Sequence, residues 1–128
     1  MRIVGDQDLG REQIAHVPIG LDPTDHRLDL PEQDLQEAIV ELAGHLGYMH
    51  YHTHDARRSP QGFPDLVLVH APRRRTIYAE LKSMKGHLTE AQTRWLHALA
   101  EAGNHVHLWT PADWITGGIE RELRGPRI

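Results

Sequence analysis

Two short segments decide the fold: GFPDLVLV at residues 62–69 and TIYAELK at residues 76–82. The apolar run in the first segment is short, rich in β-branched residues and bounded by Pro64 and Pro72, which favours a buried strand over a helix. The pair predicts a β-hairpin. If its strands fold symmetrically about the link between Pro72 and Arg73, Asp65 lies opposite Glu80.

The hairpin gathers polar groups on one of its faces. Side chains alternate along a strand, so Glu80 and Lys82 share a face, and Asp65 across the ladder joins them. Opposed Cβ atoms lie roughly 4.5 to 5.5 Å apart, and two carboxylates so close, among apolar neighbours, need a cation between them. Mg²⁺, with Mn²⁺ as a substitute, suits Asp65, Glu80 and the Leu81 carbonyl as ligands. Lys82 is then placed to polarise an attacking water.

Two helices and a further strand complete the expected core. Pro31 begins an amphipathic helix over about residues 31–46. Thr89 and Gln92 fit a capping box that begins a second helix, which ends near Ala102 and directs Trp95 inward. Residues 105–109 form a strand that the βαβ rule places parallel to the Glu80 strand. The element order is α-β-β-β-α-β.

Histidines and arginines precede the hairpin. A strand over residues 48–54 places His50, His52 and His54 on one face. These histidines fit three roles, as zinc ligands, as contacts to nucleic acid, or as hydrogen-bonded structural residues. The following loop carries Arg57 and Arg58. These arginines, with Lys85, are placed to contact a phosphate backbone, although an ordinary polar loop has the same composition.

The composition fits one domain of 128 residues without cysteine, which excludes disulfides and thiolate zinc sites. No apolar run is long enough to span a membrane and no signal peptide is visible, so a cytoplasmic protein is expected. The formal charge of −4 argues against nonspecific coating of nucleic acid. We expect three segments: an N-terminal extension (residues 1–30), a core (31–116) and a charged C-terminal tail (117–128). The extension would contain a short strand at 1–4 and a helix at 9–17, and would act as a strap or a dimer contact. The tail would be helical or disordered.

The order of these motifs resembles the PD-(D/E)xK nuclease motif, with Asp65, Glu80 and Lys82 in its named positions. More narrowly, the sequence resembles the stand-alone VRR-NUC domains, the virus-type replication-repair nucleases, over about residues 32–114. The residues that carry this narrower resemblance are Gly62-Phe63-Pro64-Asp65-Leu66, Glu80-Leu81-Lys82, Gly86, Gln92 and Trp95. The resemblance implies a restriction-endonuclease-like αβββαβ core, with a mixed central sheet flanked by helices.

The resemblance also implies roles for residues outside the hairpin. It places Gln92 near the attacking water or the phosphate; because one side chain cannot fully serve both the site and the capping box, the site is favoured. It gives Glu32 a part in holding metal or bound water, although a first-turn acid is also favoured by the helix dipole. Glu37 and Glu41 are the substitutes. It brings His52 or His54 into contact with substrate.

The function that follows is a Mg²⁺-dependent DNA endonuclease. The resemblance implies a structure-selective enzyme, like a Holliday-junction resolvase, that acts on branched DNA as a homodimer. A nicking or flap nuclease and a noncatalytic nucleic-acid-binding module are the alternatives. A zinc hydrolase that uses His50, His52 and His54 is a third.

Overall fold

The computed structural model describes residues 17–54 and 57–126, which are built around one four-stranded sheet. Strands β1 (Met49–His52), β2 (Leu66–His70), β3 (Arg75–Leu81) and β4 (His105–Trp109) lie side by side in that order. The first three are antiparallel and β4 runs parallel to β3, so the expected mixed sheet is confirmed. The strand expected at residues 1–4, and nearly all of the helix expected at 9–17, lie outside the described residues.

The hairpin of β2 and β3 has the predicted register. Leu66 pairs with Ala79 at one end of the ladder, and His70 pairs with Arg75 at the other. The same pairing, continued by one residue, places Asp65 opposite Glu80. A four-residue turn closes the hairpin, and in it the Arg74 amide donates to the Ala71 carbonyl at 2.9 Å. The register therefore follows from the symmetry of a short local turn.

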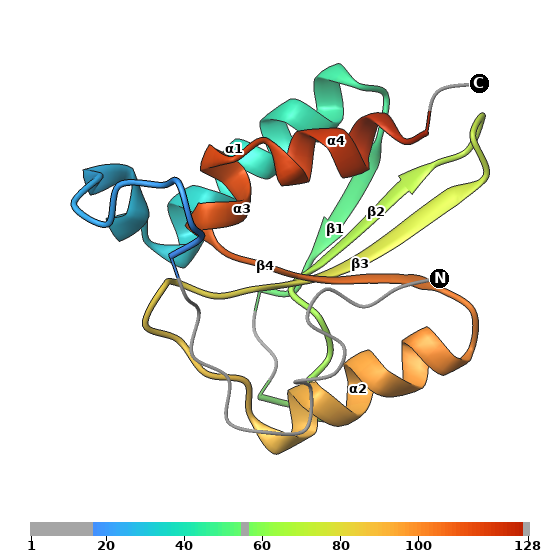
Figure 1. Cartoon of the computed structure of the whole chain (residues 1–128). Coiled ribbons are helices and arrows are strands. Elements are labelled where there is room, and N and C mark those ends of the chain that lie inside the picture. Colours follow the sequence, from blue (N-terminus) through green and yellow to red (C-terminus); the bar gives the residue numbers. More distant parts are fainter. Residues whose placement is uncertain (1–16, 55–56, 127–128) are drawn as a thin grey trace.

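Helices cover both faces of the sheet. Helix α1 (Glu32–His45) and the C-terminal helices α3 (Pro111–Ile115) and α4 (Gly118–Arg124) lie on one side, and α2 (Glu90–Glu101) covers the other (Figure 1). A short 3-10 helix, η2 (His26–Asp29), contacts α3. The order αβββαβ is thus confirmed from α1 to β4. Within residues 17–54 and 57–126, no helix combines the length and apolar character needed to cross a bilayer.

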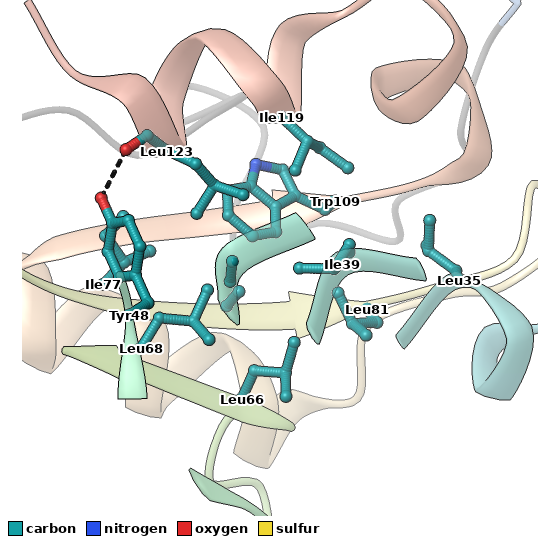
Figure 2. Packing of buried hydrophobic residues seen from close by; sticks show 12 residues of the cluster. Leu35, Ile39, Tyr48, Leu66, Leu68, Ile77, Leu81, Trp109, Ile119 and Leu123 are labelled. Atoms are coloured by element: carbon teal, nitrogen blue, oxygen red, sulfur yellow. Dashed lines mark hydrogen bonds between the residues drawn. The ribbon is translucent and has the colours of Figure 1, made fainter. Parts of the chain in front are cut away.

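The larger core lies between the sheet and helices α1 and α4 (Figure 2). Leu35 and Ile39 of α1 and Ile119 and Leu123 of α4 are almost fully buried in it. The Tyr48 hydroxyl donates to the Leu123 carbonyl at 2.7 Å and joins the start of β1 to α4. Much of the segment expected as a charged tail is therefore a helix that packs into this core; Glu120, Arg121 and Arg124 are exposed, while Glu122 turns toward the sheet.

A smaller apolar cluster lies between the sheet and α2. It contains Leu88, Leu96 and Val106, with Tyr78 and Leu108 packed against them. In β3, Ile77, Ala79 and Leu81 belong to the larger core, so alternation directs Tyr78 and Glu80 toward α2. The face of the sheet that α2 covers is therefore the one that receives the acidic side chain.

Candidate active site

Two acidic residues meet where β2 begins and β3 ends. Asp65 directly precedes β2, and its Oδ2 accepts a hydrogen bond from the Leu81 amide at 2.9 Å. This bond crosses the ladder and fixes the Asp65 carboxylate beside the end of β3. Glu80 is only 1% exposed although it is ionisable. The sheet thus brings together the two carboxylates whose meeting the hairpin pattern predicts.

The surroundings of Glu80 disfavour its negative charge. Burial raises its pKa to about 9, and repulsion from Asp65 adds to that shift. The Lys82 ammonium lies 3.8 Å from Glu80 Oε2 and opposes the shift. Glu80 Oε1 is buried and has no hydrogen-bond partner in the part of the chain that the structure describes. The Lys82 charge therefore offsets only part of the burial and the repulsion, and the carboxylate oxygens suit an additional cation.

Gln92 joins α2 to this site through both ends of its amide. Its Oε1 accepts a hydrogen bond from the backbone N–H of Thr89 at 2.9 Å. The Thr89 hydroxyl in turn accepts from the backbone N–H of Gln92, which completes the predicted capping box. Its Nε2 donates to Glu80 Oε2 at 3.0 Å. The expected competition between the cap and a contact to Glu80 is absent, because the Gln92 side-chain amide carries its acceptor and its donors on different atoms.

A cavity of about 290 Å³ opens beside the acidic pair, and we name it the acidic cavity. It lies between the start of α1 and the ends of β1 and β3; its lining comprises Glu32, Gln33, Gln36, His52, Thr53, His54, Asp65 and Leu81. Glu32 therefore lines the same cavity as Asp65, and its charge also raises the pKa of Glu80. The substitutes Glu37 and Glu41 are exposed and do not line the cavity.

The three histidines near β1 lie in a row and do not converge on one point. The rings of His50 and His52 are nearly parallel, with centroids 5.9 Å apart, and the His52 and His54 centroids are 4.4 Å apart. Among residues 17–54 and 57–126, no three histidines or acids gather closely enough to hold a metal by themselves. The structure thus gives the histidine zinc site no support, and it leaves Glu32 outside a compact cluster with Asp65 and Glu80.

The predicted cations are distributed unevenly around the site. Lys82 is close to Glu80, and Gly86 packs against it: a Cβ at position 86 would lie 3.0 Å from Lys82 Cδ. Arg57, Arg58 and Lys85 are exposed, and none of them lines the acidic cavity.

Sequence reasoning missed the aromatic residues beside this site. Trp95 is only half-buried, so its expected place in the core is wrong; its ring meets that of Phe63 edge to face at 5.1 Å. Gly62 permits this approach, because its φ is +98° and a Cβ there would lie 2.5 Å from the Ala91 carbonyl carbon. The GFPD segment thus directs the Phe63 ring and the Asp65 carboxylate into the same region. The spacing of Phe63 and Asp65, two residues apart in the sequence, could have indicated that they lie close together.

Comparison with known proteins gives a family that agrees with this geometry. The family model of the VRR-NUC domain matches residues 22–111. A solved structure described as a VRR_NUC domain protein superposes with a TM-score of 0.50 at 17% identity, over 74% of this chain and 91% of that one, and so has a similar fold. A search of curated proteins gave no match. Because the family model covers more than half of the sequence, the chain belongs to the VRR-NUC domain family, a family of nuclease domains.

Proposed function

We propose that the protein is a Mg²⁺-dependent DNA endonuclease, with Mn²⁺ as an effective substitute. The observation that carries this proposal is the pair of half-buried Asp65 and buried Glu80, with Lys82 and Gln92 beside the same Glu80 oxygen. Carboxylates at the end of a nuclease-family hairpin, with a lysine beside them, have the chemistry that phosphodiester hydrolysis needs.

The donor set fits a magnesium ion. Asp65, Glu80 and the Leu81 carbonyl offer oxygen atoms, and Glu80 Oε1 has no partner among the described residues. Mg²⁺ keeps several waters and needs only one or two carboxylates, so a compact cluster of three protein ligands is not required. Glu32, across the acidic cavity, would hold one of those waters. When bound, the ion would neutralise charge on the phosphate and lower the pKa of water.

The side chains would then divide the work of hydrolysis. Lys82 would hold the attacking water and stabilise negative charge growing on the phosphate. Gln92 would keep the Glu80 carboxylate in place through its Nε2–H. The oxygen of water would bond to phosphorus while the bond to the 3′ oxygen breaks. The water would lose a proton to solvent and the 3′ oxygen would gain one, which leaves a 5′ phosphate and a 3′ hydroxyl. His52 and His54 would contact substrate, and Arg57, Arg58 and Lys85 would bind the flanking backbone.

We further propose that branched DNA is the substrate and that the protein acts as a homodimer. Cutting two symmetric strands of a four-way junction requires two sites related by a two-fold axis, and the described residues contain one such carboxylate pair. Junction resolution therefore requires a second copy. A flap or nicking nuclease would act as a monomer, so sedimentation with and without a four-way junction separates these substrate classes.

A cleavage panel tests the proposal directly. Duplex, nicked, flap and four-way-junction DNA are each incubated with Mg²⁺ and wild-type or Lys82→Ala protein. We expect cleavage of a branched substrate, and a loss on the order of 10²- to 10³-fold in the variant, since one stabilising cation is removed from the transition state. Lys85→Ala is the matched control, because Lys85 is exposed, whereas Lys82 is half-buried and lies 3.8 Å from Glu80. Lys85→Ala should weaken DNA binding slightly and leave the rate of cleavage of bound DNA unchanged. Equal cleavage by wild type and Lys82→Ala would refute the catalytic assignment.

A further inference from the structure

A second cavity, of about 580 Å³, adjoins the acidic cavity and has a different chemistry. Its walls include three aromatic side chains, Tyr51, Phe63 and Trp95, and we name it the aromatic cavity. Its volume lies within the range of roughly 300 to 1,000 Å³ that small-molecule sites occupy. It is therefore large enough for one planar ring system and its immediate neighbours.

The two cavities share a wall. His52, Thr53 and His54 line both of them, so a group bound in the aromatic cavity lies one short segment away from Asp65. Asp65 and Phe63 are separated by Pro64 alone, which couples the position of the ring to that of the carboxylate. A ligand that spans both cavities must carry an apolar ring on one part and an anionic, metal-binding group on the next.

The aromatic side chains are arranged to receive a flat partner. Phe63 is held edge to face by Trp95, at 5.1 Å, and by Tyr78, at 6.1 Å, so its ring is fixed. Tyr51 is 63% exposed on edge strand β1, and the ring contacts found among the described residues do not involve it. An exposed tyrosine over a cavity is a platform on which a base can stack.

We infer that the aromatic cavity binds an unpaired nucleobase of the nucleotide that flanks the cut phosphate. This inference rests on the proposed nuclease function and names its substrate class as DNA with an unpaired nucleotide at the cleavage position. Every base offers a π-face to Tyr51, Phe63 and Trp95, so the contact selects strand structure and tolerates sequence. The Thr53 hydroxyl and the imidazoles of His52 and His54, which line the same cavity, then face the polar edge of the base.

The test begins from the cleavage position mapped on a branched substrate. The base of each nucleotide that flanks the cut is replaced in turn by an abasic analogue. We expect KM to rise by roughly 5- to 150-fold at one of the two positions, as base–aromatic stacking implies. Tyr51→Ala should raise KM by a similar factor on the intact substrate. On the substrate with the sensitive abasic site, Tyr51→Ala should cause no further rise in KM. Tyr51→Phe should retain the wild-type KM. Met49→Ala is the matched control, since Met49 lies on the same strand and face and is 75% exposed.

A binding measurement separates this inference from the nuclease proposal. 2-Aminopurine is placed in turn at each nucleotide next to the branch point, so that its position does not depend on a mapped cut, and its fluorescence is followed with Ca²⁺ in place of Mg²⁺. Quenching by wild type and not by Tyr51→Ala supports the base-binding cavity, even if no DNA is cleaved and the nuclease proposal fails. Normal cleavage, with KM unchanged by abasic sites and by Tyr51→Ala, overturns the inference while the nuclease proposal stands. Absence of both quenching and cleavage overturns both.

Discussion

Glu80 and Glu122 are both held against the sheet, yet their surroundings shift the two pKa values in opposite directions. Burial raises the pKa of Glu80 to about 9. A hydrogen bond from His107 and the charge of Arg75 lower the pKa of Glu122 to about 2. Glu122 Oε1 lies 3.4 Å from His107 Nε2, and its Oε2 accepts from the buried Arg75 guanidinium. Glu122 is thus paired directly with the buried Arg75 guanidinium, whereas the Lys82 ammonium lies 3.8 Å from Glu80.

This difference separates an acid whose charge stabilises the fold from one whose charge the fold disfavours. Glu122 ties α4 to β3 through Arg75 and to β4 through His107, so its charge stabilises the folded chain. Glu80 sits in surroundings that destabilise its charge, which is typical of residues retained for chemistry at the expense of stability. The comparison can be tested by removing each charge in turn.

The largest effect should come from Glu80→Gln. We expect cleavage to fall on the order of 10³-fold, because the neutral amide removes a magnesium ligand and a transition-state contact. The free energy of unfolding in urea, measured at neutral pH without divalent cations, should stay the same or rise, since Glu80 is already neutral there. Glu90→Gln is the control, as the Glu90 side chain is 91% exposed on the adjacent helix. Unfolding of Glu80→Gln under those conditions would show that Glu80 is structural.

The second effect should come from Glu122→Gln and should fall on stability. Removing this charge leaves Arg75 buried without its carboxylate, and we expect a loss of about 3 kcal/mol in the free energy of unfolding. Glu120→Gln in the same helix is the control. Glu120 pairs with Arg124 at the surface, so its removal should cost at most about 0.5 kcal/mol. Similar losses in both variants would remove the contrast between Glu80 and Glu122.

The smallest effect should appear in the pH dependence of stability without divalent cations. The pKa of Glu122 is lowered in the fold, so its contribution is present above its ordinary pKa of 4.5 and is lost as pH falls toward about 2. The pKa of Glu80 is raised, so its contribution is full below pH 4.5 and is lost as pH rises toward about 9. In Glu122→Gln, the melting temperature should therefore no longer fall as pH decreases from 4.5 toward 2. In Glu80→Gln, it should no longer fall as pH rises from 4.5 toward 9. Profiles that match wild type in both variants would contradict the opposite shifts.

Local patterns allowed the hairpin and its acidic pair to be predicted from sequence. The distance of Asp65 and Glu80 from one short turn sets their pairing, so no distant contact has to be known. The capping box of Gln92 was visible for the same reason. The division of its amide between the cap and Glu80 was not, because it depends on how α2 is placed on the sheet.

Long-range contacts explain what the sequence did not reveal. Arg75, His107 and Glu122 come from three separate elements, and the charged C-terminal segment gives no local sign that its glutamate meets them. Trp95 fits a core position by helical spacing, but in the structure its half-buried ring packs edge to face against Phe63 of the loop before Asp65. These features require tertiary structure and lie beyond patterns of periodicity.

The Gln92 side chain contacts both Thr89 and Glu80, and so links the first turn of α2 to the candidate site. Its oxygen is committed to the Thr89 amide, so the amide cannot flip without breaking the first turn of α2, and only N–H groups face Glu80. Any movement of that helix must therefore carry the donor away from the carboxylate. The candidate site is complete only when α2 is docked, so local fraying of its first turn would separate Gln92 from Glu80 before the sheet itself opens.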